Sequence, residues 1–212
     1  MTGDRDGILG GVRSYYTAKV EQHGATPAGV DWNSLESQLL RFDQLLCIVR
    51  DWDRPFSLAD LGCGYGQLYD HVRPRARQFR YHGYDLSEAM VRKARELHAD
   101  SVDASFTVSD RPTEAADYVV ASGIFNVRLS VAEPEWKDFV LDTLAVLDAA
   151  ATRGFSFNCL TSYSDASRMR ADLYYANPAE IFDHCKQRFS RNVALLHDYG
   201  LYEFTVLVRK QV

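Results

Sequence analysis

The feature that most constrains the fold is a regular alternation of short apolar runs with helical patterns along the middle of the chain. Apolar runs that suit buried strands lie at residues 56–62, 80–85, 105–109, 117–122 and from 154 onward. Amphipathic segments lie between them, among them "LSEAMVRKARELHA" with Ser87 as its cap and a helix at 134–150 with proline in its first turn. Strands that alternate with helices form a parallel sheet covered on both faces.

The two ends of the chain do not follow this alternation. "NVALLHDY" and "LYEFTVLVRK", separated by Gly200, predict an antiparallel hairpin at the edge of the sheet. Residues 1–34 are rich in glycine and polar groups and predict a loop or lid ahead of the core. A helix from Leu35 to about Val49, capped by Asn33 or Ser34, opens a single domain over residues 35–212.

Three glycines fall within five positions of "ADLGCGYGQLYD", where the first strand turns into a helix. Gly62, Gly64 and Gly66 present backbone N–H groups without side chains, so a ligand can approach closely. The dinucleotide pattern G-x-G-x-x-G requires its third glycine one residue later, where this chain has Gln67. The spacing therefore disfavours a pyrophosphate loop.

Asp85 ends the next strand, at about the separation of 20 residues expected for an acid that binds ribose hydroxyls. An ionised carboxylate only accepts hydrogen bonds, so it can bind both hydroxyls. The glycine loop and this acid together indicate a nucleoside ligand, with or without a pyrophosphate.

At these residues the chain resembles a known family. "LADLGCGYG" is similar to the first motif of class I S-adenosylmethionine-dependent methyltransferases, and "YDLSEAMVRKAR" is similar to their second strand and helix. The likeness extends over about residues 56–160, and the terminal hairpin agrees with the family's reversed seventh strand. The resemblance implies an α/β, Rossmann-like sandwich: a mainly parallel seven-stranded sheet with helices on both faces and a C-terminal antiparallel hairpin.

The same resemblance implies a set of cofactor-binding residues. Asp60 would order the loop near the methionine portion, with Gly62, Cys63 and Gly64 against the cofactor. Asp85 would bind the ribose, and Leu86 and Met90 would pack on the adenine. The remaining predicted contacts are Asp110 to the adenine amino group, with Asp103 and Asp117 flanking the same strands, and Ser122 beneath the sulfonium.

Residues outside the common core are the candidates for other roles. Arg41, on the first helix, either pairs with the cofactor's carboxylate in a bidentate contact or is an exposed helix residue. The candidate substrate-binding residues are Tyr16, Trp32, Asn126, Arg128 and Tyr174. The sequence identifies no catalytic residue, since an activated methyl group needs mainly an aligned acceptor and exclusion of water.

The composition limits the kinds of binding partner that we expect. The net charge is −5, from 24 Lys and Arg against 29 Asp and Glu, which disfavours a nucleic-acid-binding surface. The four cysteines form no Cys-x-x-Cys pair, and we expect reduced thiols, no metal site and a cytoplasmic protein. No apolar run reaches 18 residues, so no membrane span is predicted.

The functional prediction is an S-adenosylmethionine-dependent methyltransferase that acts on an oxygen or nitrogen atom of a small molecule, as a monomer or homodimer. One alternative is a cofactor-binding partner subunit whose catalysis has lapsed. The other is a nicotinamide-dependent oxidoreductase, which Gln67 disfavours.

Overall fold

The structure is a computed structural model that describes residues 5–30 and 34–210. A single sheet forms its centre, with strand order β3-β2-β1-β4-β5-β8-β7 and the short β6 paired to β5. The strands are β1 (Phe56–Leu61), β2 (Phe79–Asp85), β3 (Ala104–Val108), β4 (Ala116–Ala121), β5 (Ala151–Thr161), β6 (Tyr175–Ala176), β7 (Asn192–Leu196) and β8 (Glu203–Arg209). The α-helices are α1 (Arg5–His23), α2 (Leu35–Leu46), α3 (Gln67–Val72), α4 (Glu88–Leu97), α5 (Glu133–Ala150) and α6 (Pro178–Arg188).

The sheet confirms the predicted fold class. Strands β1 to β5 are parallel in their pairings, and β8 runs antiparallel to both β5 and β7. The strand β6, two residues long, comes from the segment between β5 and α6 and adds a short pairing at Leu160 and Thr161. The hairpin therefore inserts β8 beside β5 and leaves β7 at the edge.

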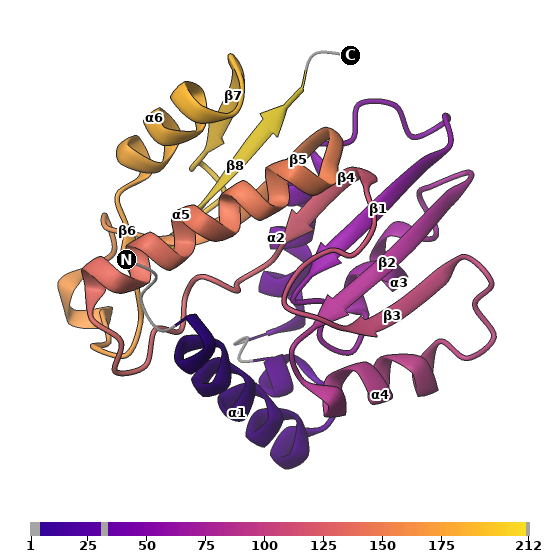
Figure 1. The fold of residues 1–212 in the computed structure, drawn as a ribbon, viewed down its shortest axis with the longest axis horizontal. Coiled ribbons are helices and arrows are strands. Elements are labelled where there is room, and N and C mark those ends of the chain that lie inside the picture. Colours follow the sequence, from indigo (N-terminus) through magenta and orange to yellow (C-terminus); the bar gives the residue numbers. More distant parts are fainter. Residues whose placement is uncertain (1–4, 31–33, 211–212) are drawn as a thin grey trace.

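Helices cover both faces of the sheet (Figure 1). One core contains side chains of α5 and α6, including the fully buried Trp136, packed on alternate residues of β1, β4 and β5. The other core contains side chains of α2, α3 and α4, including Phe42 and Leu68, packed on the opposite residues of β1 and β4 and on β2 and β3. This alternation follows from the two-residue period of a strand.

Several predicted caps are present. Ser34 accepts a hydrogen bond from the Ser37 N–H at the start of α2, and Ser87 accepts from the Met90 N–H at the start of α4. Pro134 lies in the first turn of α5. Among the helices of the described ranges, none is long and apolar enough to cross a membrane.

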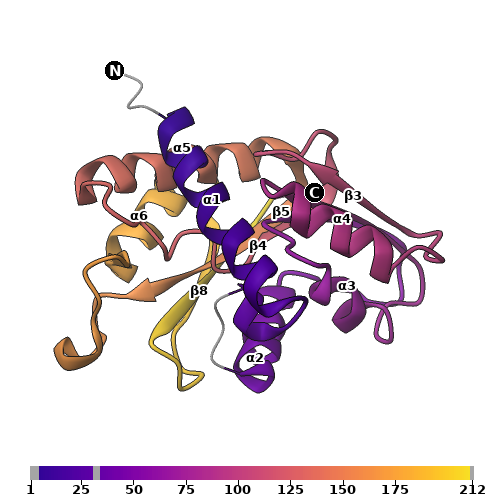
Figure 2. The same ribbon diagram turned by 90° about the horizontal axis from the view of Figure 1, so that it is seen from below.

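The N-terminal segment differs from the expectation of a loop, because residues 5–23 form α1. Figure 2 shows α1 crossing the carboxyl edge of the sheet, and the Arg5 guanidinium at its first turn lies over the Phe139 ring of α5. The Thr17 hydroxyl is hydrogen-bonded to the Ser87 hydroxyl at 2.8 Å, which ties α1 to the start of α4. The 3₁₀ turn η1 (Pro27–Val30) follows.

Candidate functional site

The glycine loop between β1 and α3 adopts a conformation that requires glycine. Gly62, Gly64 and Gly66 have φ angles of +80°, +54° and +90°, in the left-handed region that other residues enter only with strain. The backbone N–H groups of Gly62 and Cys63 both donate to the Tyr84 carbonyl, at 2.7 and 3.0 Å. The loop is therefore fixed to the end of β2.

The space beside these glycines is occupied by neighbours that close onto the loop. A Cβ atom on Gly62 would lie 2.2 Å from Cγ2 of Ile124, and one on Gly64 would lie 3.0 Å from Cγ1 of Val30. Both neighbours also line the cavity described below. Glycine is therefore needed at both positions, because a side chain there would collide with the neighbouring residues of the cavity wall.

Asp85 lies where β2 ends and joins the loop to α4. Its Oδ2 accepts from the Gly64 N–H at 2.9 Å, and its Oδ1 accepts from the Ser87 N–H at 2.8 Å. Burial raises the pKa of this carboxyl, while the backbone hydrogen bonds from Ser87, Gly64 and Leu86 oppose that rise. An ionised carboxylate has about four lone-pair sites, so capacity remains to accept from a ligand.

Asp60, on β1, is a buried acid at the base of the same region. Its Oδ2 accepts from the Tyr81 hydroxyl at 2.6 Å. Burial raises the pKa of Asp60 to about 7, against the hydrogen bond from Tyr81 and with a contribution from the nearby Asp85. Its Oδ1 is buried without a hydrogen-bond partner among the described residues.

These groups share one cavity at the carboxyl edge of the sheet, with an empty volume of about 1040 Å³ that includes its opening to solvent. Every predicted cofactor residue except Arg41 lines it: Asp60, Gly62, Cys63, Gly64, Asp85, Leu86, Met90, Asp110 and Ser122. Their common location follows from the topology, because the carboxyl ends of parallel strands meet at one edge.

Asp110 is the acid after β3 that reaches the cavity. It pairs with Arg111 at 2.9 Å and with Arg5 of α1 at 3.6 Å, and the hydrogen bond from Arg111 lowers its pKa. The flanking acids lie elsewhere: Asp103 accepts from the Tyr69 hydroxyl and Asp117 from the Ser57 N–H. Neither of the two lines the cavity.

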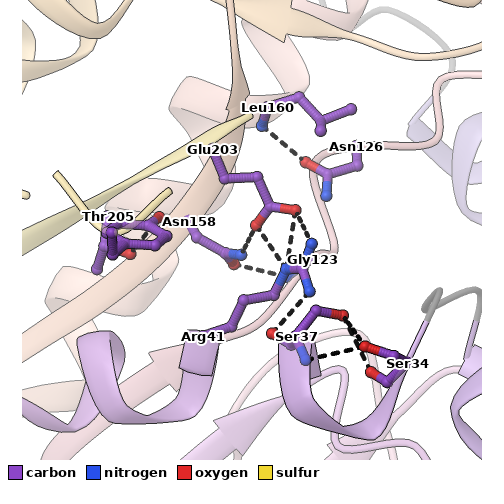
Figure 3. Close-up of polar contacts among 10 residues, drawn as sticks. Ser34, Ser37, Arg41, Gly123, Asn126, Asn158, Leu160, Glu203 and Thr205 are labelled. Carbon is purple, nitrogen blue, oxygen red and sulfur yellow. Dashed lines mark hydrogen bonds and ion pairs between the residues drawn. The ribbon is translucent and has the colours of Figure 1, made fainter. Parts of the chain in front are cut away.

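Arg41 is corrected by the structure. It is neither exposed nor among the residues that line the cavity, and its Nε and Nη2 donate to the Glu203 carboxylate of β8 (Figure 3). The Glu203 carboxylate also accepts from Asn158 Nδ2, and Asn158 Oδ1 accepts from the Gly123 N–H at 2.8 Å. Arg41 thus belongs to a buried network that reaches the loop after β4.

Some of the predicted substrate residues line the cavity and others do not. Tyr16, on α1, lines the cavity. Asn126 and Arg128 do not: Asn126 Oδ1 accepts from the Leu160 N–H, and Arg128 donates to the carbonyls of Leu173 and Val131.

Tyr174 is also absent from the cavity lining. It is 4% exposed and packs in the core on the α5 side of the sheet, where burial raises its pKa to about 12. The polar groups of Asn126 and Arg128 and the ring of Tyr174 therefore hold the β4–α5 connection and the β6 segment in place. Trp32 lies outside the described residues.

Sequence reasoning predicted a loop or lid with Tyr16 here, and it missed that this segment is the helix α1. Leu9, Val12 and Arg13 line the cavity in addition to Tyr16, so α1 forms its outer wall. The signal was present in the spacing of Ile8, Val12, Tyr16 and Val20, each four residues after the last. The glycines at positions 7, 10 and 11 disfavour a helix, so the segment was predicted as a loop. Gln38 of α2, a candidate from the sequence among the residues outside the common core, also lines the cavity.

The fold and the cavity define a nucleoside-cofactor-binding α/β protein, and comparisons with known proteins narrow that class. A family model described as "Methyltransferase domain" matches residues 59–148. "Putative methyltransferase Rv1506c" of Mycobacterium tuberculosis is 58% identical over 156 residues, which cover 74% of this chain and 94% of that protein. The chain therefore belongs to the methyltransferase family, and the nicotinamide-dependent alternative is set aside.

Solved structures share the fold at low sequence identity. The "DhpI-SAM-HEP complex" has a TM-score of 0.68 at 16% identity, covering 99% of this chain and 100% of that one. Magnesium protoporphyrin IX methyltransferase (ChlM) from Synechocystis PCC 6803 with bound SAH has a TM-score of 0.65 at 14% identity, covering 98% and 100%. These structures show the shared fold, and membership of the family makes the protein an S-adenosylmethionine-dependent methyltransferase.

The residues present fit this cofactor. At Gly62 and Gly64 the lining of the cavity is bare backbone, and the Asp85 carboxylate stands at the strand end where ribose hydroxyls would be held. When bound, S-adenosylmethionine supplies an activated methyl group. The chain's own task is to orient the two reactants and exclude water, which α1 serves by covering the cavity. Among the described residues, no cluster of three or more His, Cys, Asp or Glu side chains is placed to hold a metal ion.

Proposed function

We propose that this methyltransferase transfers the methyl group to an oxygen or nitrogen atom of a small molecule. The observation that carries the proposal is the apolar part of the cavity lining, which α1 contributes to. Its residues are Leu9, Val12, Tyr16, Val30, Phe42 and Ile124. A wall of this kind suits the body of a small acceptor and excludes a folded protein or a duplex.

The chemistry of the lining supports oxygen or nitrogen as the nucleophile. A hydroxyl or amine that is aligned with an activated methyl group needs only to lose one proton. The lining also contains carboxyl and phenol groups besides Asp85 that can accept a proton or orient a hydroxyl: Asp60, Tyr16 and Tyr65. Tyr16 already has another interaction partner within the chain.

The test follows a labelled methyl group. We expect label from S-adenosylmethionine to enter an organic extract when the protein is given a panel of small phenols, alcohols and amines. Labelled protein or nucleic acid, with no labelled small molecule, would contradict the proposed acceptor class. Binding of S-adenosylhomocysteine without transfer to any acceptor would instead favour the lapsed partner subunit.

A further inference from the structure

A second cavity lies at the amino edge of the sheet, opposite to the edge that forms the cofactor cavity. Strand β8 runs antiparallel to β5, so its last residue, Arg209, pairs with Gly154 near the start of β5, on the side away from α1 (Figure 1). Tyr118 of β4 lines this cavity four residues before Ser122 of the cofactor cavity, so their Cα atoms lie about 13 Å apart along the strand. The polar residues that line this amino-edge cavity are Arg50, Tyr118, Arg153, Asn192, Arg209 and Lys210.

The amino-edge cavity is strongly basic, and only part of its positive charge is neutralised. Arg153 Nε lies 3.0 Å from Asp117 Oδ1, and Lys210 Nζ lies 3.1 Å from Asp148 Oδ1. Within the described ranges, no carboxylate lies at ion-pair distance from the other two cations, Arg50 and Arg209. Two guanidinium groups therefore line the cavity without a negative partner, in a protein whose net charge is −5.

Arg209 holds a donor that the protein does not use. Its Nη2 donates to the Cys47 carbonyl at the end of α2, at 2.7 Å. Its Nε is buried and has no hydrogen-bond partner in the described part of the chain. Burial lowers the pKa of Arg209, and the nearby positive charge of Arg50 lowers it further. A buried N–H group without an acceptor and two neighbouring like charges are both unfavourable, and an anion between the two guanidinium groups would relieve both.

The register of the sheet adds neutral donors beside Arg209. Gly154 of β5 pairs with Tyr118 of β4 on one side and with Arg209 of β8 on the other, and Arg209 pairs in turn with Asn192 of β7. Directly paired residues point to the same face of a sheet, so these side chains form one row. Gly154 has no side chain, so the row runs from Tyr118 directly to Arg209. Tyr118 is 6% exposed and offers a phenol O–H group, and Asn192 offers an amide NH₂ group.

We propose that the amino-edge cavity binds a phosphate monoester through Arg50, Arg209 and Tyr118. A phosphate monoester carries a charge of about −1.5 to −2 at pH 7, which matches two unneutralised guanidinium groups better than the single charge of a carboxylate does. Its oxygen atoms accept from Arg209 Nε, from Arg50 and from the Tyr118 hydroxyl. The cavity has an empty volume of about 880 Å³, opening included, which leaves room for the organic part of the ester.

This ligand is distinct from the cofactor and from the methyl acceptor. Among the described residues, the two cavities share no lining residue, and they lie at opposite edges of the sheet. The inference therefore does not depend on the acceptor class proposed above.

Calorimetry with ribose 5-phosphate tests the proposal. S-adenosylhomocysteine is present at saturation, so that the cofactor cavity is filled and the sugar cannot bind there. We expect a dissociation constant below about 1 mM for ribose 5-phosphate and no measurable binding of ribose, which lacks the phosphate. Arg209→Gln should weaken ribose 5-phosphate about tenfold, the scale of one lost hydrogen bond to a charged group.

Two further variants separate a binding site from a fold defect and from general attraction of anions. Arg50→Gln changes an exposed residue that makes no ion pair among the described residues, so it should fold normally and also weaken the ligand about tenfold. Arg77→Gln removes a charge at the same edge of the sheet but outside this cavity, and affinity should stay within about twofold of the wild type. The proposal is overturned if ribose 5-phosphate does not bind at about 10 mM, if Arg50→Gln binds it like the wild type, or if Arg77→Gln weakens it as much as Arg50→Gln does.

Discussion

The Arg41 guanidinium and the Glu203 carboxylate form a buried, two-pronged ion pair that joins α2 to β8. Arg41 Nε lies 2.8 Å from both carboxylate oxygens, and Nη2 lies 2.6 Å from Oε1. The side chains are 8% and 1% exposed. Such a pair recovers in attraction about what it loses in desolvation, so its main effect is to fix where α2 lies over the sheet.

Breaking this pair from one side should destabilise the protein more than removing both charges. Glu203→Ala leaves the Arg41 charge buried, and we expect the free energy of unfolding to fall by about 3–5 kcal/mol. The double variant Arg41→Met with Glu203→Leu should regain a large part of that loss, as measured by urea unfolding. A double variant no more stable than the single one would contradict this view of the pair.

Asn158 should transmit the network to the cavity. The Glu203 carboxylate can only accept, so it orients the Asn158 amide with Nδ2 toward it and Oδ1 toward the Gly123 N–H. Asn158→Leu leaves that N–H without a partner, and we expect about tenfold weaker binding of S-adenosylhomocysteine and faster amide exchange at Gly123.

Ser156 is the matched control for Asn158. It lies on the same face of β5, is equally buried, and donates to the Leu45 carbonyl of α2 instead of the loop. Ser156→Ala should cost about 1 kcal/mol of stability and leave cofactor affinity unchanged. Equal losses of affinity in the two variants would show that the network acts through overall stability alone.

The limits of sequence reasoning are visible in these residues. The glycine loop and Asp85 were predictable because each lies at the end of a recognisable strand, and strand ends gather at one edge of the sheet. The role of Arg41 was not, because its partner Glu203 is 162 residues away and no local pattern connects them. Gln38 could be named as a candidate from the sequence, and the packing of α2 on the sheet brings it to the cavity.

Asp60 should make the stability depend on pH. Its pKa is about 7 in the folded protein against 3.8 ordinarily, so between these values the folded state holds a proton that the unfolded state has lost. Stability from this group is present below pH 4 and is lost as the pH rises to about 7, by up to about 1.4 kcal/mol per pH unit. Asp60→Asn removes the titration and keeps an oxygen for Tyr81 to donate to. Urea unfolding from pH 4 to 8 should show that the free energy of unfolding of the variant rises relative to that of the wild type up to about pH 7. A difference between the two free energies that does not change with pH would contradict the raised pKa of Asp60.

Asp85 should contribute strongly to cofactor affinity. Asp85→Ala removes a carboxylate that would accept from the ribose and that orders the Gly64 and Ser87 N–H groups. We expect calorimetry to show a loss of about 1.5–3 kcal/mol in S-adenosylhomocysteine binding. Asp103→Ala, which removes an acid near β3 that does not line the cavity, should show none. Unchanged affinity in Asp85→Ala would remove this residue from the ribose.

Gly64 should be required for the close approach of the cofactor. A side chain there would project beside Val30 and Met90, so Gly64→Val should abolish detectable binding of S-adenosylhomocysteine. Gly200→Val controls for backbone strain, because Gly200 has a φ of +74° with open space around its Cβ position. Both variants should lose about 1–2 kcal/mol of stability from the left-handed conformation, and only Gly64→Val should lose the ligand. If both bind S-adenosylhomocysteine equally well, the cofactor does not lie against the bare backbone of this loop.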